Sequence, residues 1–312
     1  MKKLKKFLIG ILTFSLLSVP TLTIASSASN DGVIDERWGV PILAHGANLS
    51  DDQLNQVKNI LGVTGTQFDS VAVTGADMVY FLGSGNPNTS MYSSALITRR
   101  AVGEGVEVSI LTPNDITRVT EVQYANAMIT AGVTDALVEI AAPFPVTGEA
   151  ALTGIYLAFY ERGYEFDADR MEVAQQELEI TSSIAGELEN HPDFNSEDLD
   201  AVLLEVKNNL AEIYDAAGEI ASNEEVQRVV GEALENNGLY DLITPEQMQR
   251  IAGFASRFQL TDAIRSPEFR DQLTSLADRI GMDVGSLLGN ISRDQAVGFF
   301  ARIANWFRNL FN

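Results

Sequence analysis

The sequence contains no cysteine and only two histidines, His45 and His191. Disulfide bonds and the usual zinc sites, which are built from cysteines or paired histidines, are therefore excluded. The phosphate-loop pattern GxxxxGK[ST] and the nucleophile pattern GxSxG are also absent, which excludes a P-loop and the nucleophile elbow of an α/β-hydrolase. We expect no metal and no cofactor, and these patterns assign no catalytic residue.

Lysine is scarce after residue 28, where only Lys58 and Lys207 remain, whereas residues 2–6 contain four lysines. This basic start precedes an apolar run at residues 7–19 and then small residues up to Ala28. The order is typical of a secretory signal peptide, and the run is short for a membrane span, which needs about 20 residues. We predict a signal peptide at residues 1–28, with no lipid-anchoring cysteine and no second span, and hence a secreted or cell-envelope-associated protein.

Positive charge is also scarce overall, with 21 basic residues against 43 acidic ones. Loss of the four lysines of the signal peptide changes the net charge from −22 to −26. Such an acidic surface argues against nucleic acid as a partner, because that binding depends on cationic contacts to phosphates. It fits a saline or alkaline exterior, where negative charge favours solubility, and equally fits compositional drift in one lineage.

The periodicity of apolar residues divides the chain into two parts. Residues 38–164 alternate between strand-like and helix-like runs in the order β-α-β-α-β-β-α-β-α, which predicts an α/β domain with a mixed sheet. The segment Gly103-Glu104-Gly105 predicts a hairpin between the two adjacent strands. Residues 167–312 have only helical periodicity, with helix starts such as Thr244-Pro245 and Ser266-Pro267, and predict an all-α region.

A Val-Thr-Gly sequence occurs twice, each time after a β-rich run and before a helix. Thr74 and Thr147 are the predicted N-caps, and Asp77 and Glu149 place a carboxylate in each first turn. A helix N-terminus after a strand can also bind an anion, with which these carboxylates would compete. If the strand that ends at His45 is parallel to its neighbours, all five residues share one sheet edge and form a candidate ligand-binding site.

The C-terminal residues 292–312 depart from the acidic composition of the chain. The pattern predicts an amphipathic helix with a broad apolar face and three arginines against one acid, and its candidate contact residues are Phe300, Arg302, Trp306, Phe307 and Arg308. This helix would lie on an anionic membrane surface, dock on the helical array of the same chain, or mediate self-association.

Three stretches resemble a known family: "VTGADMVYFLG", "NTSMYSSALITRRAVGEGVEVSI" and "YANAMITAGVTDALVEIAAPFPVTGEAALTGIY". They are similar to the YpuA-like exported proteins of Gram-positive bacteria, a family catalogued as domain of unknown function one thousand and two, over His45 to Phe159. The resemblance implies export and an envelope or extracellular setting, and it implies no catalytic residue.

Two functions from different classes remain open. The first is a non-catalytic binding or scaffold protein of the cell envelope, whose partners would be the cell wall, a membrane surface or a second copy. The second is an enzyme that acts on an envelope polymer or small ligand in a cleft at the strand ends, using acids such as Asp77 and Glu149.

Overall fold

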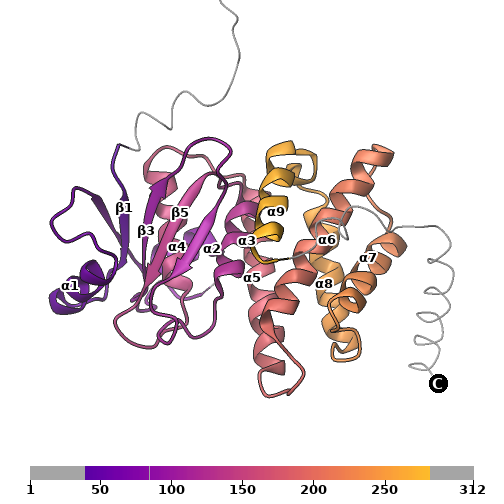
Figure 1. Cartoon of the computed structure of the whole chain (residues 1–312), viewed down its shortest axis with the longest axis horizontal. Helices are drawn as coiled ribbons and strands as arrows, with labels where there is room; N and C mark the ends of the chain where they lie inside the picture. Colours follow the sequence, from indigo (N-terminus) through magenta and orange to yellow (C-terminus); the bar gives the residue numbers. More distant parts are fainter. Residues whose placement is uncertain (1–38, 84, 282–312) are drawn as a thin grey trace, which may run out of the picture.

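The computed structural model describes residues 39–83 and 85–281 (Figure 1). The predicted signal peptide and the predicted C-terminal amphipathic helix, with Phe300, Arg302, Trp306, Phe307 and Arg308, lie outside the described residues. Within them, the elements follow one another as the periodicity predicts, β-α-β-α-β-β-α-β-α up to residue 161 and helices after it.

Five strands form one sheet in the order β2-β1-β3-β5-β4. They are β1 (Ile42–Gly46), β2 (Asp69–Val73), β3 (Ser94–Arg99), β4 (Glu107–Ile110) and β5 (Ala136–Ala141). β1 is parallel to β2 and β5 is parallel to β4, whereas β3 is antiparallel to both β1 and β5. The predicted mixed sheet is therefore confirmed, and β3 alone runs against the other four strands.

The predicted hairpin at Gly103-Glu104-Gly105 is wrong, because β5 lies between β3 and β4. The carboxylate of Asp135, immediately before β5, accepts hydrogen bonds from the backbone N–H groups of Gly103 and Gly105, both at 2.9 Å. The turn is thus bound to the start of β5 instead of joining two paired strands. Positive φ angles at Gly103 and Gly105, +87° and +72°, explain why glycine occupies both positions.

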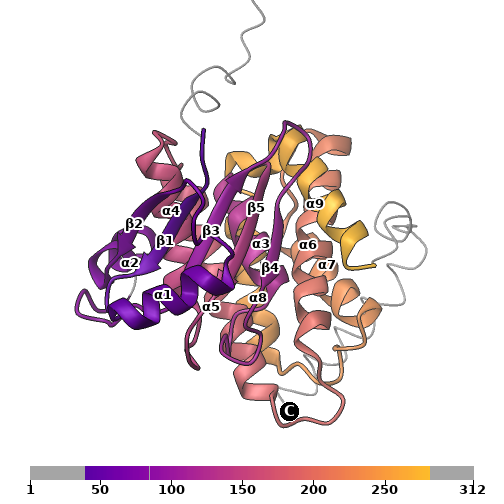
Figure 2. The ribbon, with the colours of Figure 1, turned by 60° about the vertical axis from the view of Figure 1, so that its left-hand side comes forward.

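Helices cover both faces of the sheet (Figures 1 and 2). α1 (Asp51–Ile60) covers one face, where Leu43 packs against Val57 and Leu61. The other face, which includes Ile42 and Ala44, is covered by α2 (Gly75–Leu82), α3 (Glu121–Ala131) and α4 (Glu149–Glu161). α4 lies close to β1 because its Gly154 has no side chain: a Cβ atom there would be 2.8 Å from that of Ala44.

The remaining helices are α5 (Ala168–Leu188), α6 (Ser196–Ala217), α7 (Asn223–Asn236), α8 (Pro245–Phe258) and α9 (Pro267–Arg279), with a 3-10 turn at Asp262–Arg265. Within the described residues after 167 every element is helical, and α8 and α9 begin at the predicted Thr244-Pro245 and Ser266-Pro267. Thr244 and Ser266 cap α8 and α9 by accepting hydrogen bonds from the N–H groups three residues on, and a proline occupies the first position of each helix.

One hydrophobic core continues from the sheet into the helical region. α3 joins the two, since it contacts β4 on one side and α5, α6 and α9 on the others, and nine of its eleven residues are buried. A buried polar cluster ties these helices together: the Lys207 ammonium, 0 % exposed, donates to Glu177 at 2.7 Å and to Asn126 at 2.9 Å. The boundary near residue 165 marks a change in secondary structure within this continuous core.

Candidate functional site

The predicted site residues lie near the carboxyl ends of the parallel strands. Because β1, β2, β4 and β5 point the same way, their carboxyl ends share one edge of the sheet with the amino end of β3. Thr74 directly follows β2, and Thr147 precedes α4, which follows β5. The structure places these segments at this common edge but brings only some of the predicted side chains into one cavity.

Thr74 caps α2, as predicted. Its hydroxyl accepts a hydrogen bond from the N–H of Asp77 at 3.3 Å, while an Asp77 carboxylate oxygen accepts from the Thr74 N–H at 2.8 Å and from its hydroxyl at 2.6 Å. The loop that precedes β3 closes over this helix end, since a Cβ on Gly75 would lie 2.6 Å from the carbonyl oxygen of Pro87. The polar groups of this turn therefore stabilise the helix end itself.

Thr147 is not the cap of α4, so that prediction is wrong. The N-cap is Gly148, with φ +113° and no side-chain hydrogen bond, and the Thr147 hydroxyl instead donates to the carboxylate of Glu149. The carbonyl oxygen of Gly148 accepts hydrogen bonds from Tyr124 at 2.8 Å and Ser93 at 3.2 Å. A side chain at Gly148 would collide with Tyr124, and φ is positive there, which together explain why glycine occupies this position.

A small cavity of about 220 Å³ lies at this edge, which we call the strand-end cleft. Its lining residues are Met78, Thr89–Ser93 and Val146–Ala150, so Thr147 and Glu149 face it and Thr74 and Asp77 are not part of its lining. His45 lies apart from the cleft: it is on the α1 side of β1, the side of Leu43, and burial lowers its pKa.

A larger groove of about 990 Å³ was not predicted from the sequence; we call it the aromatic groove. It lies between the C-terminal ends of α2 and α4, the first half of α5 and α8. Its apolar lining includes Tyr80, Phe81, Leu82, Tyr160, Phe166 and Met171, and its polar lining includes Glu165, Glu172, Gln175, Gln176, Glu179 and Arg257.

Two tyrosines in the aromatic groove are largely open to solvent, Tyr80 at 69 % and Tyr160 at 49 % exposure. Their ring centroids are 6.1 Å apart, and both pack edge-on against Phe81, at 4.9 and 5.9 Å. Phe166 continues the cluster toward the buried Tyr156, at 5.3 Å. The exposed rings are thus held by a rigid aromatic base, an arrangement suited to binding a flat apolar surface.

In the sequence, the stretch "YLAFYERGYEF" at residues 156–166 indicates an aromatic cluster near this groove. It places five aromatic residues within eleven positions, across the end of α4 and the loop before α5. Tyr156 and Phe159 are buried, whereas Tyr160, one turn after Tyr156 and at the end of α4, is half exposed. The contribution of Tyr80 comes from α2, about 80 positions earlier, and only the fold brings it to the same place.

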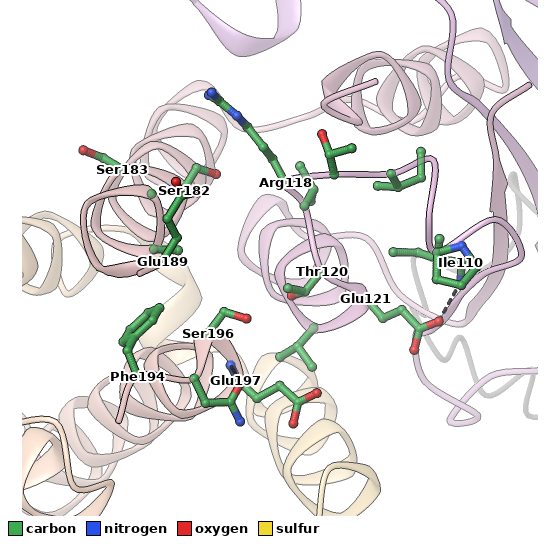
Figure 3. Close-up of a pocket in the computed structure, with 18 of the residues that line it drawn as sticks. Ile110, Arg118, Thr120, Glu121, Ser182, Ser183, Glu189, Phe194, Ser196 and Glu197 are labelled. Carbon is green, nitrogen blue, oxygen red and sulfur yellow. Dashed lines mark hydrogen bonds between the residues drawn. The ribbon is translucent and has the colours of Figure 1, made fainter. Parts of the chain in front are cut away.

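A second wide groove, of about 1020 Å³, opens between the start of α3, the end of α5 and the start of α6 (Figure 3). Four glutamates line it, Glu121, Glu187, Glu189 and Glu197, together with Arg118. Phe194 is its one aromatic residue. Thr120 is part of its lining, and the Thr120 hydroxyl donates a hydrogen bond to the buried carboxylate of Asp200 at 2.8 Å.

Comparison with known sequences places the chain in a family. The model of the family described as "Protein of unknown function (DUF1002)" matches residues 45–276. The chain belongs to this family. It is 28 % identical to the "Uncharacterized protein YpuA" of Bacillus subtilis (strain 168), over 99 % of this chain and 100 % of that protein. No solved structure matches it.

Family membership brings no activity to these sites, since the family is one of unknown function. No helix in residues 39–83 and 85–281 is both long enough and apolar enough to span a membrane. The same residues contain no group of three or more histidine, aspartate and glutamate side chains placed to hold a metal ion.

Proposed function

We propose that this family member is an exported binding protein of the cell envelope, which holds an uncharged, sugar-containing polymer in the aromatic groove. The observation that carries the proposal is the pair of exposed tyrosines, Tyr80 and Tyr160, supported from below by Phe81. Sugar rings have apolar faces that stack on aromatic rings, and tyrosine offers a large contact area at low conformational cost.

The polar lining of the groove supports the same class of ligand. The carboxylates of Glu165 and Glu179 and the amides of Gln175 and Gln176 are suited to hydrogen bonds with hydroxyl groups along such a polymer. The net charge of the chain, −22, works against polymers that carry phosphate or carboxylate groups. A groove of about 990 Å³ also accommodates several sugar units rather than a single small molecule.

The cellular setting in this proposal comes from the N-terminal sequence. Residues 1–28 have the basic, apolar and small-residue order of a signal peptide, and they support export of the folded part of the chain. Expression of the full chain, followed by N-terminal sequencing of the protein in the medium and in the wall fraction, tests this part. A protein that keeps residues 1–28 and stays in the cytoplasm would contradict it.

A purified cell-wall glycan and its soluble oligosaccharides test the binding proposal in sedimentation and calorimetric assays. We expect Tyr80→Ala and Tyr160→Ala each to weaken binding about tenfold, the loss of roughly 1.4 kcal/mol expected for one stacked ring. Tyr92→Ala is the matched control, because this tyrosine lines the strand-end cleft instead. Equal binding by all three variants and the parent chain would refute the groove as the site.

The alternative is an enzyme that acts at the strand-end cleft, and the observation in its favour is the carboxylate of Glu149 in the cleft lining. Its predicted partner, Asp77, is engaged in the cap of α2. Incubation of the same glycan with the parent chain, followed by analysis of released fragments, separates the two functions. Fragments that disappear with Glu149→Gln, while Tyr80→Ala still releases them, would favour the enzyme.

A further inference from the structure

Among residues 39–83 and 85–281, three of the six large exposed apolar side chains line the aromatic groove or the hollow beside it, and Val102, Leu111 and Ile220 do not. Tyr80 and Tyr160 line the groove, and Leu260, 67 % exposed, lines a smaller adjoining hollow of about 230 Å³. The two hollows share Glu172 and Arg257, which form an ion pair between them. Large exposed apolar side chains on one contiguous surface mark an interaction site. Here that surface comprises the aromatic groove and the adjoining hollow, so it extends beyond the groove.

The charge of this surface is negative. Asp169, Glu165, Glu172 and Glu179 line the two hollows, and Arg257 is the basic residue in their lining. Because Arg257 is paired with Glu172, three carboxylates face solvent without a cation from the lining beside them. An occupant with aromatic side chains and a few positive charges would match both properties of the surface.

We propose that the C-terminal segment 292–312 of the same chain docks on the aromatic groove and its adjoining hollow. This segment combines Phe300, Trp306 and Phe307 with Arg302 and Arg308, in a chain whose composition is otherwise strongly acidic. Its aromatic residues match the exposed tyrosines and Leu260, and its arginines match the carboxylates of the rim.

The length of the chain permits this contact. The first turn of α9 lies near the start of α5, the helix that lines the groove: the ring of Phe269 is 5.8 Å from the guanidinium of Arg170, which is adjacent in sequence to the groove residue Met171. α9 has 13 residues and is therefore about 20 Å long. The ten residues 282–291 span up to about 35 Å when extended, enough to return along α9.

Docking would regulate the site, and this consequence depends on the proposed function. The segment and the polymer would compete for Tyr80 and Tyr160, so the chain would bind polymer more weakly than a chain that ends at residue 291. The docking assay contains no polymer. The polymer-binding assay uses the chain that ends at residue 291, which lacks the segment. Failure of one proposal is thereby distinguished from failure of the other.

Trp306 provides the test in the full chain. The sequence contains one other tryptophan, Trp38, so the variant Trp38→Phe leaves Trp306 as the single fluorescent indole. We expect its emission at shorter wavelength than that of the free peptide 292–312, and reduced quenching by acrylamide. The double variant Glu165→Gln with Glu179→Gln changes two exposed rim carboxylates and is expected to weaken binding of the labelled peptide to the chain ending at residue 291 about fivefold.

Glu121→Gln with Glu189→Gln is the matched control, since these two exposed glutamates line the other wide groove (Figure 3). Peptide binding lost in this control but kept in the rim variant would overturn the proposal in favour of that groove. Trp306 emission equal to that of the free peptide, or shifted only when anionic phospholipid vesicles are added, would also overturn it. A shift that depends on protein concentration would overturn docking within one chain in favour of a second copy.

Discussion

Replacement of Asp200 by asparagine is expected to change how the stability of the protein depends on pH. The Asp200 carboxylate is fully buried at the start of α6 and accepts a hydrogen bond from the Thr120 hydroxyl at 2.8 Å. Burial raises its pKa from the ordinary value of 3.8 to about 7, with a further contribution from the nearby Glu177. The folded protein therefore retains a proton on Asp200 over a pH range in which the unfolded chain has released it.

The sign and size of the effect follow from this difference. Proton release by the unfolded chain favours unfolding, so the stabilisation is complete below about pH 4 and is lost as the pH rises to about 7. The loss amounts to about 4 kcal/mol, at about 1.4 kcal/mol for each pKa unit. Asparagine keeps the shape and an acceptor for Thr120 but does not titrate, so Asp200→Asn lacks this contribution.

Urea unfolding followed by circular dichroism at pH 4.5, 6, 7 and 8 measures the effect. Other carboxylates titrate in both proteins, so the quantity of interest is the difference in unfolding free energy between variant and parent. We expect this difference to shift in favour of Asp200→Asn by about 3 kcal/mol from the lowest to the highest pH, because about 1 kcal/mol of the loss occurs below pH 4.5. Asp193→Asn, at an exposed position, is the control. A difference for Asp200→Asn that stays constant across this range would refute the reasoning.

Further predictions concern the buried ion pair, helix packing and a helix cap. Lys207→Met leaves the buried Glu177 without its cation and is expected to cost about 3–5 kcal/mol in urea unfolding, largely recovered by adding Glu177→Gln. Gly154→Ala should cost about 1–3 kcal/mol, because its Cβ would press on β1, whereas Gly253→Ala, which meets open space in α8, should raise the melting temperature. Thr74→Ala should cost about 1 kcal/mol through loss of the α2 cap.

The order of elements could be predicted because each depends on neighbouring residues. Caps such as Thr74 and Thr244 and the apolar periodicity of each helix are local signals, and the structure confirms them. The cap at Thr147 failed for a nonlocal reason: Tyr124, from α3, occupies the space next to Gly148 and hydrogen-bonds its carbonyl group. This helix end is therefore in contact with a helix more than 20 residues away, which no local pattern shows.

The sheet order and the grooves could not be read from local pattern. Nothing in β3 and β4 shows that β5 inserts between them, since the decisive contacts are those of Asp135 with the glycine turn before β4. The strand-end cleft was predicted in position, but His45 has its side chain on the other face of the sheet. The aromatic groove needs Tyr80 and Tyr160 from separate helices, so it arises only when α2 packs on α4.

The position of α3 has a consequence for any attempt to shorten the protein. Its residues are buried all round, and Asn126 and Thr130 face Lys207 and Glu177 of the helices beyond. A fragment ending near residue 165 would keep every strand yet expose this helix, including polar groups selected for a buried environment. We expect such a fragment to aggregate or remain partly unordered, so the five strands and the helices packed directly on them do not form an independent folding unit.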